Sequence, residues 1–161
     1  MNSSTALETL FQHHRWANLN LLELCAALTS DQLDSTLVGT FGSIRDTLQH
    51  IASAERSYLS RISTGQPYRR PEDSPPMTLD DMKESLTNSG AGLIEWVAKV
   101  QGADTVEIDW DGTLRQVPKS ILLTQAINHA TEHRAQIMSI LTEIGIQPPE
   151  LDAWAYFDSL E

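Results

Sequence analysis

The stretch from Leu122 to Ile144 has apolar residues at helical spacing, and two histidines lie on the same face. The apolar positions are Leu122, Ala126, Ile137, Ile140 and Ile144. Steps of three and four residues predict the buried face of one long helix. His129 and His133 fall on that face one turn apart, with about 5–6 Å between their Cβ atoms. Burial of an imidazole costs free energy unless it is hydrogen-bonded or bound to a metal, so the fold must supply partners for both rings.

Three earlier segments, about residues 5–28, 43–65 and 78–100, have the same periodicity and predict three more helices. Each begins with a capping box, in which a Ser or Thr and an acidic residue three positions later bond each other's backbone N–H groups. The pairs are Thr5 with Glu8, Ser43 with Asp46, and Thr78 with Asp81. Residues 89–92, Ser-Gly-Ala-Gly, weaken the last of these helices and predict a kink or a close helix contact. A short turn is predicted at residues 31–33.

The segments between and after these helices carry different signals. Residues 106–117 alternate around Asp111-Gly112, which predicts a β-hairpin anchored on the helices by Ile108 and Trp110. The proline-rich Gly65–Pro76 loop is expected to cross one end of the domain, with Arg69-Arg70 as a solvated pair rather than an anion site. Gly145 and Pro148-Pro149 end the fourth helix. The aromatic tail 151–160 is expected to fold back over the helices.

These elements predict an all-α protein, a four-helix bundle with a small hairpin before the last helix, in one domain spanning residues 1–161. A net charge of -11 argues against binding to nucleic acid or anionic lipid, which both need a basic surface. The single cysteine, Cys25, excludes an internal disulfide and is expected in the core of a cytoplasmic protein. No apolar run is long enough for a transmembrane helix.

A third histidine, His50, lies at the edge of the apolar face of residues 43–65. Facing helices of a bundle can therefore bring His50, His129 and His133 together as metal ligands. The alternative is that the histidines are core residues bonded to neighbours such as Thr47 or Tyr58. His14 is a rival third ligand, because it lies on the apolar face of the first helix. Neither His13 nor His14 has a partner at i+4, and a structural role is favoured for both.

The chain resembles the DinB/YfiT-like family along nearly its whole length. The resemblance rests on Trp16-Ala17-Asn18, on Thr47-Leu48-Gln49-His50-Ile51 followed by Glu55, on His129-x-x-x-His133-Arg134-Ala135-Gln136-Ile137, and on Gly145 with Pro148-Pro149. It implies a bundle with up-down-down-up helix order and a metal site formed by His50, His129 and His133. His13 stands where relatives often have a tyrosine.

Three neutral ligands leave the charge of a divalent metal uncompensated, so a substrate thiolate or carboxylate would be attracted. Zinc suits three imidazoles best, and nickel, iron or copper are also accepted. Glu55, Asn128 and Glu132 are candidates for orienting the imidazoles. A solvated surface position is at least as strong an alternative for each of them.

The resemblance implies a metal-dependent enzyme, of which a transferase using a low-molecular-weight thiol of the bacillithiol, mycothiol or glutathione type is the leading hypothesis. Its partners would be a small-molecule substrate and a second copy in a homodimer. The alternatives are a metal-dependent hydrolase and a non-catalytic metal-binding or stress-response protein that acts as a dimer. A DNA-associated role is disfavoured by the acidic charge.

Overall fold

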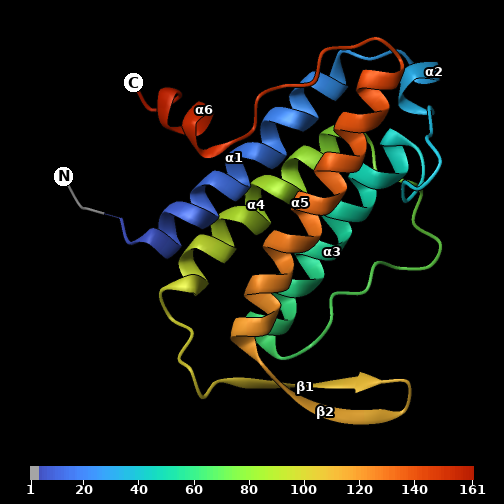
Figure 1. The fold of residues 1–161 in the computed structure, drawn as a ribbon. Helices are drawn as coiled ribbons and strands as arrows, with labels where there is room; N and C mark the ends of the chain where they lie inside the picture. Colours follow the sequence, from blue (N-terminus) through green and yellow to red (C-terminus); the bar gives the residue numbers. More distant parts are fainter. Residues whose placement is uncertain (1–3) are drawn as a thin grey trace.

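The computed structural model describes residues 4–161, which form six helices and two strands. In chain order these elements are α1 (Ala6–Ala26), α2 (Ser30–Leu33), α3 (Ile44–Thr64), α4 (Leu79–Val97), β1 (Thr105–Trp110), β2 (Thr113–Pro118), α5 (Lys119–Glu143) and α6 (Ala153–Asp158). The four long helices lie side by side, and the hairpin projects from one end (Figure 1). The predicted helical fold with one hairpin before the last long helix is therefore confirmed. None of the described helices is long and apolar enough to cross a membrane.

The helix ends follow the predicted local chemistry. Capping boxes begin α1 at Thr5, α3 at Ser43 and α4 at Thr78. A further capping box at Thr29 begins α2, where the sequence predicted only a turn. The left-handed Gly145 ends α5, because the amides of residues 145 and 146 turn back onto the carbonyls of Thr142 and Leu141.

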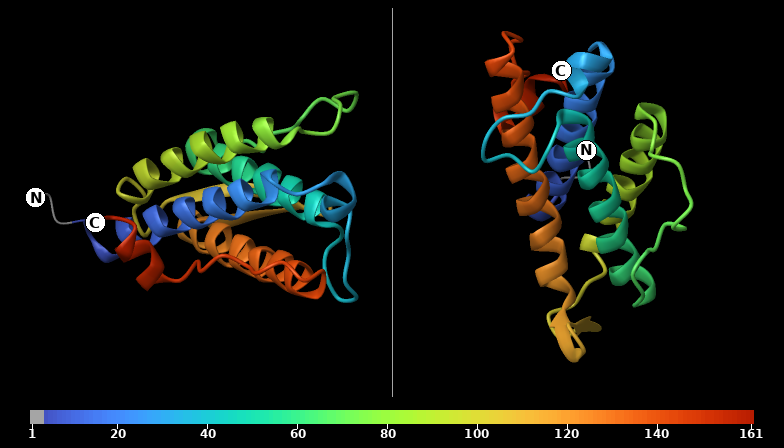
Figure 2. Two further views of the ribbon diagram at one scale, coloured as in Figure 1. Left: turned by 90° about the horizontal axis from the view of Figure 1, so that it is seen from above. Right: turned by 90° about the vertical axis from the view of Figure 1, so that its right-hand side faces the viewer.

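The predicted weak patch in α4 is a close helix contact rather than a break, since α4 is continuous through residues 89–92. A Cβ at Gly90 would lie 2.6 Å from Cγ of Arg15 on α1, and a Cβ at Gly92 would lie 2.5 Å from Cδ2 of Leu59 on α3. The two glycines therefore let α4 pack closely against both neighbours. The remaining long helix, α5, packs chiefly against α3 (Figures 1 and 2).

The hairpin forms around the predicted turn, with positive φ at both Asp111 and Gly112. Val106 pairs with Val117 in the antiparallel register and is its buried residue. The prediction that Trp110 anchors the hairpin is wrong, because its side chain is 55% exposed. Trp110 lies at the tip of the ladder, beyond the reach of the helices, and Arg115 covers part of its ring.

Two connecting segments determine which surfaces remain open. The segment after α3 was predicted to cross one end of the domain, and this prediction is wrong. The segment instead runs along α3 from end to end (Figures 1 and 2). The C-terminal segment folds back as predicted, and α6 lies on α1 through the buried Tyr156. Trp154 and Phe157 of the same short helix remain exposed.

The core consists of two apolar clusters, one toward α2 and one toward the hairpin. Five buried polar residues, one or two from each long helix, lie between them: His14, Asn18, Glu55, Ser89 and Arg134. Cys25 is fully buried in the first cluster as predicted, and burial raises its pKa to about 12. Buried polar groups are stable only when they are hydrogen-bonded, so this polar layer constrains how the four helices align.

Candidate metal centre

His50 on α3 and His129 and His133 on α5 meet between the two helices. One ring nitrogen from each lies within 4.8 Å of the others. Nε2 of His129 is 2.9 Å from Nε2 of His50. The ring centroids are 4.4–4.8 Å apart. The three histidines therefore come together from facing helices, as predicted.

Gln136 determines which nitrogen of His133 faces the other two rings. Its side-chain oxygen lies 3.0 Å from Nδ1 of His133 and accepts the backbone N–H of Phe41 at 3.1 Å. Because a carboxamide oxygen can only accept, Nδ1 of His133 carries the proton. Nε2 therefore keeps its lone pair, which is the form that binds a metal.

Phe41, in the segment between α2 and α3, covers one side of the cluster. Its ring stacks on His50 with centroids 4.1 Å apart and an angle of 15° between the planes. It also meets His133 edge to face at 5.3 Å. This contact limits ring rotation at His50, although Phe41 itself is 53% exposed.

The electrostatic environment keeps two of the imidazoles neutral. Burial, followed by the proximity of His133 and His50, lowers the pKa of His129 to about 4. Burial and His133 also lower the pKa of His50. At neutral pH both rings are therefore uncharged and can donate lone pairs to a cation.

A pocket of about 370 Å³ lies directly beside the cluster. It is lined by Phe41, Asp46, Gln49, His50 and Ser53. Asp46 is committed to the capping box of α3, where it accepts hydrogen bonds from Ser43. Small molecules can thus approach the edge of the cluster from the outer face of α3.

His14, the rival third ligand, belongs to the buried polar layer instead. Its Nε2 lies 2.7 Å from a carboxylate oxygen of Glu55, and both side chains are almost fully buried. Glu55 also accepts hydrogen bonds from Asn18 and Ser89. Glu55, a candidate for orienting the cluster imidazoles or for a solvated position, does neither, because it is buried and bonds to His14.

The other predicted orienting residues, Asn128 and Glu132, are exposed and have no hydrogen bond to the cluster among the described side chains. Two residues that do contact it, Gln136 and Phe41, were not identified from sequence. Gln136 could have been, because it follows His133 by three positions on one helical face. Phe41 could not, because it lies in a loop far from the α5 histidines along the chain.

Neither Thr47 nor Tyr58 forms a hydrogen bond to the histidine cluster, and His13 has a structural role. Thr47 donates its hydroxyl to the Ser43 carbonyl at 2.7 Å, so it does not serve the cluster. Tyr58 only meets the edge of His129, at 5.9 Å between centroids. His13 contacts the Leu151 carbonyl at 2.8 Å through Nε2 and packs on Tyr156, and thereby holds the C-terminal segment on α1.

The donor set fits a divalent metal. A tetrahedral zinc with Zn–N bonds of about 2.0–2.1 Å holds its ligand nitrogens roughly 3.4 Å apart. The nitrogens of this cluster all lie within 4.8 Å of one another, so small ring movements would bring them to that spacing. Within residues 4–161 the cluster contains no further His, Cys, Asp or Glu. Three protein ligands leave a coordination position free, as in catalytic rather than structural zinc sites.

Fold and site together define a class, helical proteins with a three-histidine candidate metal centre between two long helices. The family model described as DinB family matches residues 1–160, and the chain belongs to that family. This is the family that the sequence motifs resembled.

Solved structures agree with this assignment at the level of the fold. A DinB-like protein from Bacillus cereus is 19% identical, with a TM-score of 0.62, over 86% of this chain and 91% of that one. A DinB-like protein from Bacillus subtilis is 16% identical, with a TM-score of 0.63, over 92% of this chain and 99% of that one. No curated protein matches the chain.

Proposed function

We propose that His50, His129 and His133 bind a divalent metal and that the protein is a metal-dependent enzyme. The observation that carries the proposal is the hydrogen bond between His133 and Gln136, which directs a lone pair into a cluster with no fourth protein ligand among the described residues. Zinc suits three imidazoles best, with nickel or iron as alternatives.

The metal would supply Lewis-acid chemistry, withdrawing electron density from a ligand bound at its free position. The chain's own residues prepare the site for that role. The lowered pKa values of His129 and His50 keep the rings neutral, and Gln136 holds the tautomer of His133. Phe41 shields one side of His50 from water, while the pocket beside His50 gives a substrate access.

For the reaction, we propose transfer of a low-molecular-weight thiol of the bacillithiol, mycothiol or glutathione class to an electrophile. A metal held by His50, His129 and His133 would lower the pKa of a thiol at its free position and so favour the thiolate, which is the nucleophilic form. The support is the charge balance of the donor set together with membership of the DinB family. Hydrolysis is the alternative reaction at the same centre.

Elemental analysis of purified protein tests the site. We expect about one metal per chain, as three ligands at one centre require, and loss of that metal in His129→Ala and His133→Ala. His13→Ala is the matched control, because His13 lies outside the cluster and should leave the metal content unchanged. A full metal complement in both cluster variants would refute the site.

An activity screen separates the reactions. The protein is incubated with each of the three thiols and a panel of electrophiles, with and without added metal. Turnover that requires both thiol and metal, and that disappears in His133→Ala, supports the transferase. Metal-dependent turnover without thiol would indicate a hydrolase, and a loaded site without turnover would favour the non-catalytic, metal-binding alternative.

We further propose that the chain is one domain whose long helices follow the up-down-down-up order, since the segment between α3 and α4 runs back along the molecule.

A homodimer is part of the same proposal. Leu7 and Leu10, which are 48% and 43% exposed, line one apolar hollow together with Leu123 and Ile127, as at surfaces that pair. Light scattering coupled to size-exclusion chromatography should give twice the chain mass, and a monomer at high concentration would refute it.

A further inference from the structure

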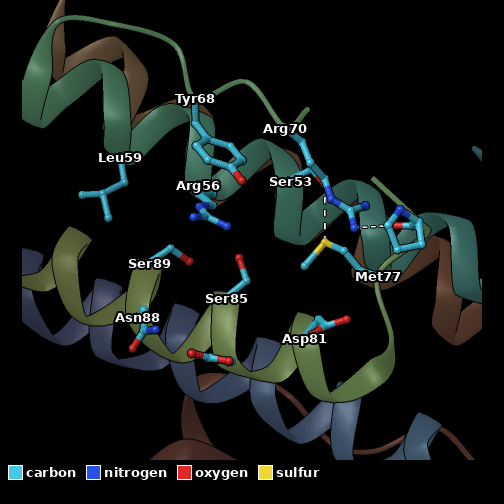
Figure 3. A pocket seen from close by; sticks show the side chains of 12 residues that line it. Ser53, Arg56, Leu59, Tyr68, Arg70, Met77, Asp81, Ser85, Asn88 and Ser89 are labelled. Atoms are coloured by element: carbon cyan, nitrogen blue, oxygen red, sulfur yellow. Dashed lines mark hydrogen bonds between the residues drawn. The ribbon is translucent and has the colours of Figure 1, made fainter. Parts of the chain in front are cut away.

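A second pocket, of about 570 Å³, lies between α3 and α4 beneath the segment that joins them (Figure 3). Its volume falls within the range typical of small-molecule sites, about 300–1,000 Å³. It is separate from the histidine cluster, because no histidine lines it. Ser53 is the only lining residue that it shares with the pocket beside His50.

The α4 side of this pocket contains a buried polar group without a partner. Ser85 is 9% exposed, and its hydroxyl has no hydrogen bond within the described part of the chain. The hydroxyl points toward Arg56 across the pocket (Figure 3). Ser89, one turn further along α4, instead donates to the buried Glu55. An unsatisfied buried hydroxyl costs free energy that a polar ligand can recover.

The α3 and loop side of the pocket is cationic. The Arg56 guanidinium lies 3.8 Å from the centroid of the Tyr68 ring, which holds it in place and leaves its N–H edges available. Arg70, from the loop, donates to the Pro75 carbonyl. Neither arginine forms an ion pair with any residue in 4–161. Arg70 was expected to be merely solvated, yet it is half-buried and lines this pocket.

The opposite side, from α4, is anionic. Asp81 and Glu84 line it, with Asn88 one turn beyond Glu84. One oxygen of Asp81 accepts the Thr78 backbone N–H at 2.8 Å, and this bond is the main reason that its pKa is lowered, with attraction to Arg70 the smallest cause. Glu84 forms no ion pair in the described residues and is the freer carboxylate.

We propose that this pocket binds a small zwitterion of the amino-acid or dipeptide class, with its carboxylate toward Arg56, Arg70 and Ser85 and its ammonium group toward Glu84. Guanidinium groups pair well with a carboxylate, and walls of opposite sign favour a ligand with both charges over one with either. The pocket exceeds the size of one amino acid and accommodates a dipeptide. The site is independent of the metal centre and of the proposed reaction.

Titration with glycylglycine, followed by ¹H–¹⁵N NMR, tests the proposal. The backbone amides of Tyr68, Ser85 and Asn88 should shift, while those of the hairpin should not. N-acetylglycylglycine lacks the ammonium group and glycylglycinamide lacks the carboxylate. Each should bind about tenfold more weakly, because a hydrogen bond to a charged group contributes at least that factor.

Variants of the protein complete the test. Arg56→Gln, Glu84→Gln and Ser85→Ala should each weaken glycylglycine binding, the first two by about tenfold. Arg115→Gln removes the same charge from the hairpin and should bind as the original protein does. Arg56 and Glu84 are exposed, so their variants are expected to fold, and the unchanged hairpin amides verify this. His133→Ala should also bind normally, which separates this site from the metal centre.

Three results would overturn the proposal. If glycylglycine shifts no pocket amide, there is no dipeptide site. If the acetylated peptide binds as tightly as the free one, the pocket holds an anion rather than a zwitterion. If Arg56→Gln and Glu84→Gln both bind as the original protein does, the ligand lies elsewhere.

Discussion

At the scale of one residue, Gln136 shows how a neutral side chain orients an imidazole of the proposed metal centre. It accepts from Nδ1 of His133 and from the Phe41 backbone with the same oxygen. The first bond fixes the tautomer, and the second holds the covering loop near the cluster. Loss of a partner of this kind typically lowers metal affinity by about 10- to 100-fold.

We predict that Gln136→Leu keeps the fold and lowers zinc affinity by about 10-fold or more, because the His133 ring loses its orienting acceptor. Competition with a chromophoric chelator measures the affinity. Gln125→Leu makes the same substitution at an exposed position of α5 and should bind zinc normally. Equal affinity in the two variants would show that Gln136 does not position His133.

The metal-free protein should lose stability as the pH falls from about 6.5 to about 4. The pKa of His129 is lowered from 6.5 to about 4 in the folded protein, so the unfolded chain binds its proton first over this interval. The lowered pKa of His50 acts in the same direction. Below both pKa values His129 contributes no further loss.

Thermal unfolding in the presence of a chelator, at several pH values across this interval, measures the effect. His129→Ala should show a smaller decrease in melting temperature between neutral and acidic pH than the original protein. An identical decrease in both proteins would assign the acid sensitivity to other groups.

At the scale of helices, the buried polar layer connects all four long elements. Glu55 of α3 bonds to His14 and Asn18 of α1 and to Ser89 of α4, and Asn18 accepts from Arg134 of α5 at 2.6 Å. Burial lowers the pKa of Arg134 to about 10, and attraction to Glu55 opposes the shift. Arg134 therefore stays charged at neutral pH. It directly follows His133, so the layer helps to fix the rotation of α5.

We predict that Glu55→Ala lowers the free energy of unfolding by about 3–5 kcal/mol, since it leaves a buried guanidinium and several donors uncompensated. Glu55→Gln keeps acceptor capacity and should cost less. Glu132→Ala, at an exposed position, should change stability by less than about 0.5 kcal/mol. Urea unfolding measures all three, and a Glu55→Ala cost as small as that of Glu132→Ala would remove the structural role of the layer.

At the scale of the whole molecule, the proposed metal centre lies between α3 and α5. Its ligands come from positions 50, 129 and 133, which are distant along the chain. An unfolded chain cannot hold them together, so the native state alone should bind the metal tightly.

Zinc should therefore raise the stability of the whole fold, by about 2.7 kcal/mol at a free concentration 100 times its dissociation constant. The melting temperature, recorded with increasing zinc, measures this stabilisation. His133→Ala should show no such increase. A rise of equal size in that variant would mean that zinc binds elsewhere.

Much of this protein could be predicted from its sequence, because the information is local. Helical spacing of apolar residues, capping boxes at Thr5, Ser43 and Thr78, and the Asp111-Gly112 turn depend on residues at most a few positions apart. The same spacing placed His129 and His133 on one buried face. His50 and His14 were both candidates for the third member of the cluster, and the family resemblance favoured His50.

Tertiary structure alone decided how distant polar groups pair. His14 was a rival metal ligand from sequence and Glu55 a candidate for orienting the imidazoles, yet they bind each other, because α1 and α3 present them in the middle of the core. Phe41 joined the cluster through a loop, and Arg56, Arg70 and Glu84 met around a pocket that no motif marks. Helical periodicity tells which face of a helix is buried, but the partner across that face depends on how the helices align, and only packing of the whole chain sets that alignment.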